Sequence, residues 1–101
     1  MKRLMGLLKK TDIFLHNLRP GSSTKLGLGA KQLRKDFPQL IYCDVGAFGH
    51  IGPLKDQPGY EPLMQAYGGL VSINGHPEGP EARIAVSLID LGTGMWSAIV
   101  L

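Results

Sequence analysis

The chain has almost no cysteine: Cys43 is the only one among 101 residues. A single thiol cannot form an internal disulfide, so a reducing, cytoplasmic compartment is the expected setting. The three histidines do not combine with this cysteine in a metal-ligand spacing such as His-x3-His or Cys-x2-Cys. We therefore expect no metal site.

A strong charge of one sign is also missing. Eleven basic residues stand against eight acidic ones, for a formal net charge of +3. No run of lysine and arginine is interleaved with aromatic residues, which argues against nucleic acid as a partner. The small positive excess is compatible with an anionic small ligand. The Walker phosphate loop and the Gly-x-Ser-x-Gly elbow are absent as well.

Hydrophobic runs of membrane length are absent. The opening "MKRLMGLLKK" has only about four apolar residues before Lys9 and Lys10, fewer than the ~7 that a signal peptide needs. The closing "IAVSLIDLGTGMWSAIVL" contains Asp90 and two glycines, and it falls short of the ~20 apolar residues of a membrane span. We expect no membrane partner and interpret this segment as a buried helix that carries Asp90.

The patterns that are present predict a single α/β domain at most. Short apolar runs with β-branched and aromatic residues predict strands, and helical spacing of apolar residues predicts helices. The order strand, helix, strand, helix, helix after an initial helix is typical of a parallel sheet with covering helices. The expected helices span residues 2–10, 30–37, 60–73 and 83–101, and the expected strands span residues 12–17 and 39–48.

The stretch "HNLRPGSSTKLGLG", residues 16–29, turns at Arg19-Pro20-Gly21 and is rich in glycine. Its composition suits neither a strand nor a regular helix, so it is either a plain loop or a backbone left bare for a ligand. Open α/β sheets bind ligands at the carboxyl ends of their strands. Asn17 to Arg19 come at the end of the first expected strand, and Val45 to Phe48 occupy the junction between the second strand and its loop. The alternatives are an ordinary proline turn and ordinary strand-end packing. Lys25 is either a phosphate partner or a solvated surface residue.

Asp90 is the residue whose surroundings ask for an explanation. Val86, Leu88, Ile89 and Leu91 flank it. A carboxylate in apolar surroundings is costly unless it has a partner or a chemical role. It is therefore either an aspartate at a helix N-terminus, a paired buried carboxylate, or a reactive group.

Three segments together carry a resemblance: "DIFLHNLRPGSSTKLGLGAKQLRKDFPQLIYCDVGAFGHIGP", "PGYEPLMQAYGGLVSINGHPEGP" and "VSLIDLGTGMWSAI". In this order and spacing, over about residues 10–101, the chain closely resembles the family III CoA-transferases. Formyl-CoA transferase, carnitine CoA-transferase and α-methylacyl-CoA racemase belong to this superfamily. Its members are several times longer and form interlocked homodimers. The resemblance implies that residues 1–101 are an internal fragment of the large domain, a partial Rossmann-like parallel sheet with covering helices.

The resemblance implies that Asp90, in "SLIDLGTG", is the nucleophile. Its carboxylate would attack an acyl-CoA thioester to give an acyl-aspartyl anhydride. The CoA thiolate would convert the anhydride to an aspartyl-CoA thioester, and an acceptor acid would then take the CoA. Carboxylate nucleophiles divide one difficult exchange into easier covalent steps in this way.

The resemblance also implies a CoA-facing surface and a substrate class. Coenzyme A and acyl-CoA would be substrates, a carboxylic acid would be the acceptor, and no cofactor would be bound permanently. The residues expected along CoA are Asn17, Leu18, Arg19, Lys25, Val45, Gly46, Ala47 and Phe48.

Two alternatives stay open. The racemases of the superfamily carry Gly-His-Asp where this chain has Gly59-Tyr60-Glu61, and Tyr60 removes their proton-transfer histidine; CoA transfer is therefore favoured over racemisation. The other alternative is a non-catalytic remnant or a CoA-binding module, because family members carry a nucleotide-fold segment that is not found here. We expect these 101 residues to be inactive alone. His16, His50 and His76 are interpreted as structural or surface residues, and Gln65 as a packing residue.

Overall fold

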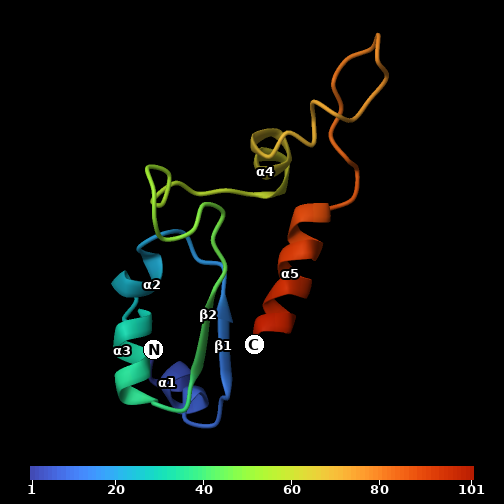
Figure 1. Cartoon of the computed structure of the whole chain (residues 1–101). Helices are drawn as coiled ribbons and strands as arrows, with labels where there is room; N and C mark the ends of the chain where they lie inside the picture. The colour runs from blue at the N-terminus through green and yellow to red at the C-terminus, as the bar shows by residue number, and fades with distance from the viewer. The chain divides into compact units, whose positions relative to one another are not determined.

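The computed structural model describes all 101 residues, and the chain divides into two compact units, residues 1–58 and 59–100 (Figure 1). The first unit contains two strands and three helices, and the second contains two helices joined by a long loop. The elements of the first unit are α1 (Lys2–Leu8), β1 (Ile13–His16), α2 (Ser22–Lys25), α3 (Ala30–Asp36) and β2 (Ile41–Asp44). Those of the second are α4 (Glu61–Tyr67) and α5 (Leu88–Val100).

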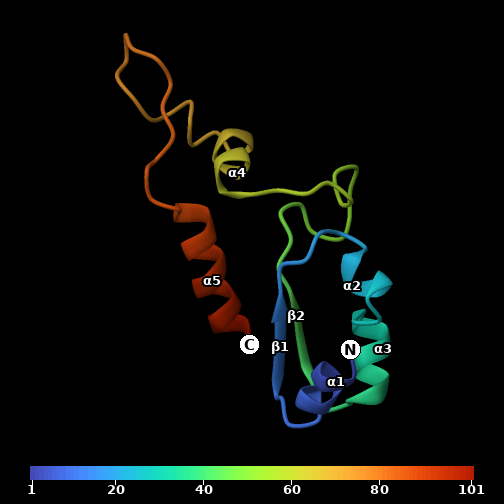
Figure 2. The same ribbon diagram turned by 180° about the vertical axis from the view of Figure 1, so that it is seen from behind.

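The sheet of the first unit confirms the expected parallel arrangement. β1 and β2 pair in parallel, with Ile13 opposite Ile41 and His16 opposite Asp44. The helices of this unit lie on one side of the strands, as the views from the front and from behind agree (Figures 1 and 2). Parallel strands need such a crossover connection, and here α2 and α3 supply it.

The core of this unit lies between the helices and one face of the sheet. Successive side chains of a strand point to opposite faces, so Phe14 and Tyr42 face the helices while Ile13 and Ile41 face away. Phe14 and Tyr42 pack against a cluster of buried side chains. Its members are Leu8, Leu28, Leu33, Phe37 and Leu40. The other face of the pair remains exposed and apolar, with Leu15 about half accessible.

The stretch 16–29 contains a helix that the sequence did not predict. Ser22–Lys25 forms one helical turn, α2, between Gly21 and Gly27. Both glycines have positive φ, 74° and 73°, a conformation that other residues rarely adopt. The interpretation of this stretch as free of helix was therefore wrong, because two left-handed glycines isolate a single turn too short to show helical periodicity.

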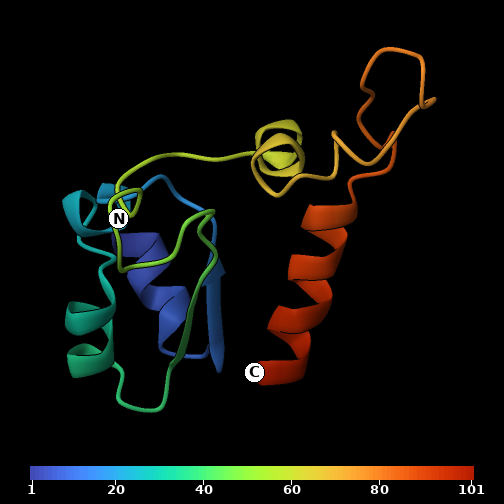
Figure 3. The same cartoon turned by 45° about the horizontal axis from the view of Figure 1, so that its top comes forward.

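The two helices of the second unit are shorter than expected. α4 ends at Tyr67 rather than at residue 73, because Gly68 and Gly69 follow and Gly69 has a φ of 81°. α5 starts at Leu88 rather than at residue 83, and Figure 3 shows it as one continuous helix. Between them, a loop closes on itself through a backbone bridge of Gly75 with Glu81.

α5 is not the buried helix that its apolar sequence predicted. None of its residues is buried, and Trp96 is 68% exposed. The prediction was wrong because apolar composition shows only that a helix is able to pack against an apolar surface. Within this unit α4 is the only other helix, and it is too short to cover α5. None of the helices combines the length and the apolar character needed to cross a bilayer.

Candidate functional site

The start of α5 is held by a carboxylate from α4. Glu61 accepts the backbone N–H of Ile89 on Oε1 at 3.1 Å and that of Asp90 on Oε2 at 2.6 Å. These N–H groups belong to the second and third residues of α5, which have no acceptor within the helix. The side chain of the N-cap residue usually accepts these N–H groups. Here Glu61 accepts them, although it lies 28 positions before Ile89 and 29 before Asp90.

Gln65 fixes Glu61 and the chain that leads into α5. It is fully buried, and its Nε2 donates to Glu61 Oε1 at 2.6 Å and to the Ile84 carbonyl at 3.2 Å. Its Oε1 accepts the Ile84 N–H at 2.9 Å. The packing role expected for Gln65 is therefore incomplete: this side chain satisfies the backbone at Ile84 and keeps residues before α5 out of the helix.

The environment of Glu61 favours its ionised form. Burial acts to raise the pKa of this carboxyl, since it disfavours charge. The hydrogen bonds from the Gln65 amide and from the N–H groups of Asp90 and Ile89 outweigh burial and lower the pKa below its ordinary value of 4.5. Glu61 is thus an anion that anchors the helix start.

Asp90 lies in the first turn of α5 with an exposed side chain. Its backbone N–H is bound to Glu61, while its carboxylate makes no hydrogen bond and no ion pair. Of the alternatives, the structure shows an aspartate at a helix N-terminus. The apolar, buried setting was wrong, because the flanking residues of a helix point in other directions and none of them is buried. A fixed backbone with an unengaged carboxylate is a suitable arrangement for a nucleophile.

The two strand ends of the first unit meet at one edge, as the parallel sheet requires. Asn17 to Arg19 follow β1, and Val45 to Phe48 follow β2. The Val45 N–H donates to the His16 carbonyl at 2.9 Å, which joins the two segments where they leave the sheet. The structure therefore brings together these two sets of predicted residues.

The backbone along this edge is open. Asn17, Arg19 and Gly46 are exposed, and Val45 and Phe48 are partly buried. No atom lies within 4 Å of the position that a Cβ would occupy at Gly46, and its φ is not positive. The fold of this unit therefore does not itself require glycine at that position.

Lys25 and Asp90 belong to neither of the two strand-end segments. Lys25 ends α2, is exposed and pairs with no carboxylate. Leu18 and Ala47 lie within the two segments, Leu18 with 36% of its surface exposed. Asp90 belongs to the second unit, whereas the other predicted residues all belong to the first.

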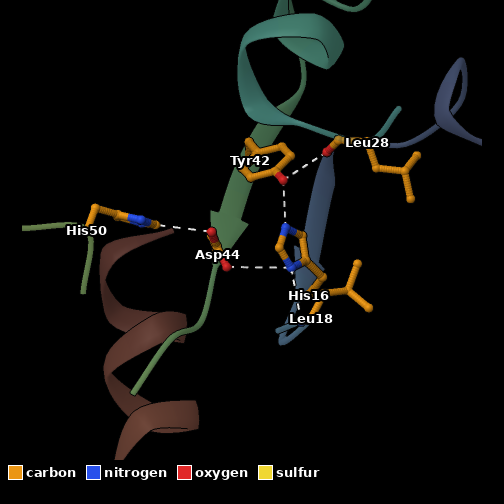
Figure 4. A network of polar contacts seen from close by, with 6 residues as sticks. All are labelled: His16, Leu18, Leu28, Tyr42, Asp44 and His50. Carbon is orange, nitrogen blue, oxygen red and sulfur yellow. Dashed lines mark hydrogen bonds and ion pairs between the residues drawn. The ribbon is translucent and has the colours of Figure 1, made fainter. Parts of the chain in front are cut away.

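A polar network behind the strand ends involves residues that the sequence left as structural (Figure 4). The buried His16 ring lies between Tyr42 and Asp44, with Nε2 2.6 Å from the Tyr42 hydroxyl and Nδ1 3.5 Å from Asp44 Oδ1. Tyr42 donates its proton to the Leu28 carbonyl at 2.9 Å. The exposed His50 lies 3.8 Å from the other oxygen of Asp44.

The sequence carries partial signals for these missed residues. Glu61 and Gln65 are four residues apart in an expected helix, so they share a face. His16 and Asp44 lie within the two expected strands, and the parallel pairing of these strands places them opposite each other. No group of three or more histidine, cysteine, aspartate or glutamate side chains is arranged to hold a metal ion.

Comparison with known proteins shows which family this chain resembles. The model of CoA-transferase family III matches residues 2–101, which is nearly the whole chain. The chain belongs to the family III CoA-transferases. It is 37% identical over 93 residues to acetyl-CoA:oxalate CoA-transferase of Acetobacter aceti, covering 91% of this chain and 24% of that protein. It is 35% identical over 86 residues to the mouse succinyl-CoA:glutarate CoA-transferase, covering 85% of this chain and 20% of that protein.

The fold agrees with that of solved family members. A crystal structure of a CaiB/BaiF family protein from Brucella suis superposes with a TM-score of 0.91 at 33% identity, covering 98% of this chain and 26% of that one. The expected family and α/β fold are thus confirmed. This family III CoA-transferase chain spans about a fifth to a quarter of the length of these relatives.

Proposed function

We propose that this chain carries the nucleophile and part of the CoA-binding edge of an enzyme that transfers CoA from an acyl-CoA to a carboxylic acid. The observation that carries the proposal is the unengaged Asp90 carboxylate on a backbone held by Glu61, in a chain that matches the family over residues 2–101. The chain would form part of the large domain of a longer polypeptide, and that polypeptide would assemble as an interlocked homodimer.

The proposed reaction has two covalent stages. A carboxylate oxygen of Asp90 attacks the thioester carbon of acyl-CoA, the C–S bond breaks, and CoA leaves as thiolate from a mixed anhydride. The thiolate attacks the aspartyl carbonyl of this anhydride, which releases the donor acid and leaves an aspartyl-CoA thioester. The acceptor carboxylate then repeats the two steps in reverse order, forming the new acyl-CoA and the free Asp90 carboxylate.

The strand ends of the first unit suit the CoA chain. Asn17 to Arg19 and Val45 to Phe48 lie where open parallel sheets bind ligands, and the open backbone at Gly46 allows a ligand to approach closely. Lys25 is an exposed cation without a carboxylate partner, and an ammonium group binds phosphate without strict geometric requirements.

A segment exchange tests the proposal. This chain replaces the matching segment of the Acetobacter aceti relative, whose name gives acetyl-CoA and oxalate as the substrates to assay. The chimera should form oxalyl-CoA, and hydroxylamine should convert the aspartyl thioester to a hydroxamate that peptide mass spectrometry maps to Asp90. Modification of a different carboxylate would refute the nucleophile. Binding of CoA without turnover would favour a binding module, and epimerisation of a 2-methylacyl-CoA would favour the racemase.

Gly46 offers a test of the CoA-facing edge. Gly46→Val should leave the unfolding free energy of the chain nearly unchanged, because a Cβ at this position meets no atom within 4 Å. The same substitution should raise the KM of the chimera for acetyl-CoA by roughly tenfold or more, since a bulky side chain would stand where the ligand approaches. Ile51→Val, at a residue 92% exposed, is the control and should change neither quantity. An unchanged KM in Gly46→Val would place CoA elsewhere.

A further inference from the structure

The hydrogen bonds around His16 indicate which nitrogen of the neutral ring carries the hydrogen. The only proton of the Tyr42 hydroxyl goes to the Leu28 carbonyl, so Tyr42 must accept from His16, and Nε2 carries the hydrogen. Nδ1 of the neutral ring then has a free lone pair. The Leu18 N–H donates to it at 3.3 Å. The ring thus bridges the protein core and the backbone just beyond β1 (Figure 4).

A second partner stands at the same nitrogen. Asp44 Oδ1 lies 3.5 Å from Nδ1, and a carboxylate can only accept. Asp44 therefore gains a hydrogen bond only when Nδ1 is protonated, and Leu18 keeps its bond only when Nδ1 is not. The two partners exclude one another, and one proton decides between them.

We propose that neutral His16 positions the end of β1 by accepting the Leu18 N–H, and that protonation turns Nδ1 toward Asp44 and releases this amide. The charged and titratable groups that face the ring are Asp44 and Tyr42, both from β2, and His50 reaches it only through the second oxygen of Asp44. The consequence of this protonation for CoA rests on the proposed function, since Leu18 lies in the segment proposed to face CoA.

The consequence concerns binding rather than chemistry. A released Leu18 amide loosens the backbone of Asn17 to Arg19, while Asp90 is untouched. Acidification should therefore raise the KM for acyl-CoA through His16. His16 is a positioning residue in this proposal, because it acts through the backbone and not on the reacting atoms.

The test follows the Leu18 amide of this chain by NMR as a function of pH, together with the His16 ring signals. The amide shift should change with the same midpoint as the ring, and the amide should exchange with solvent roughly tenfold faster when the ring is charged. Asp44→Asn removes the carboxylate that would accept from the charged ring, so the Leu18 amide should keep more of its protection on acidification. A Leu18 amide that ignores the His16 titration would overturn the proposal.

His76 supplies a matched control within the same molecule. Its Nδ1 faces the N–H of Glu78, also two residues later, at 3.4 Å, but the ring is exposed and no carboxylate pairs with it. The Glu78 amide should therefore show no comparable loss of protection, and His76→Gln should leave the Leu18 transition unchanged.

The chimera separates this inference from the proposed function. A rise of the acetyl-CoA KM on acidification that His16→Gln abolishes supports both. A Leu18 transition without any change in KM keeps His16 as a positioning residue and refutes CoA along Asn17 to Arg19. If Asp90→Asn abolishes transfer but the Leu18 amide signal does not change with the protonation of His16, the proposed function stands and the role of His16 is refuted.

Discussion

Replacing Asp90 by asparagine should reduce CoA transfer by the chimera by roughly a thousandfold or more. The amide has nearly the shape of the carboxylate, but it is neutral and cannot attack a thioester or carry an anhydride. The backbone N–H of residue 90 stays bound to Glu61, so the start of α5 should be unchanged. The measurement is kcat for oxalyl-CoA formation, with circular dichroism to compare the helix content.

The control for this loss is Asp56→Asn. The Asp56 side chain is 78% exposed, belongs to the first unit and forms an ion pair with the neighbouring Lys55. Its substitution removes the same charge and should leave kcat within about twofold, as surface changes usually do. Transfer that persists in Asp90→Asn at the rate of the Asp56 variant would show that Asp90 is not the nucleophile.

The first unit shows how much of the fold local patterns can predict. Short apolar runs with β-branched and aromatic residues were sufficient to identify both strands, and the order of the elements predicted their parallel pairing. α2 was missed because a single turn between Gly21 and Gly27 has no periodicity to detect. The limits of α4 and α5 were missed for a different reason. Gly69 ends α4, and the hydrogen bond from the Ile84 N–H to Gln65 keeps Ile84 out of α5.

The candidate site likewise contains residues that sequence patterns could predict and residues that they could not. Strand-end residues such as Asn17 and Val45 could be predicted to lie at one edge, because parallel strands bring their carboxyl ends together. The link between Glu61 and Asp90 could not be predicted, because it joins residues 29 positions apart through a backbone N–H that any residue type carries. The exposure of Asp90 was also missed, since composition shows what surrounds a residue in sequence and not what covers it in space.

Glu61→Gln should have the next largest effect, through the geometry of Asp90. Glutamine keeps the length of the side chain but offers one acceptor oxygen where the carboxylate has two, and its NH2 group would face an N–H donor of α5. The amides of Ile89 and Asp90 should exchange with solvent roughly tenfold faster or more. In the chimera kcat should fall by roughly ten- to a hundredfold with little change in KM, because the nucleophile is displaced and the CoA-facing edge is not. Glu78→Gln, in the exposed loop of the same unit, should change neither quantity.

The pH dependence of stability distinguishes a charged anchor at Glu61 from one that merely fills space. The pKa of Glu61 is lowered on folding, so the folded state binds this proton less tightly than the unfolded state does. The stabilisation from the anion is therefore complete above the ordinary value of 4.5 and is lost as the pH falls through the lowered pKa of the folded state. Urea unfolding between about pH 3 and pH 6 should show this acid-side loss in the wild-type chain and a smaller one in Glu61→Gln. Equal losses in both proteins would mean that the charge of Glu61 does not hold α5, and the drop in kcat would then need another cause.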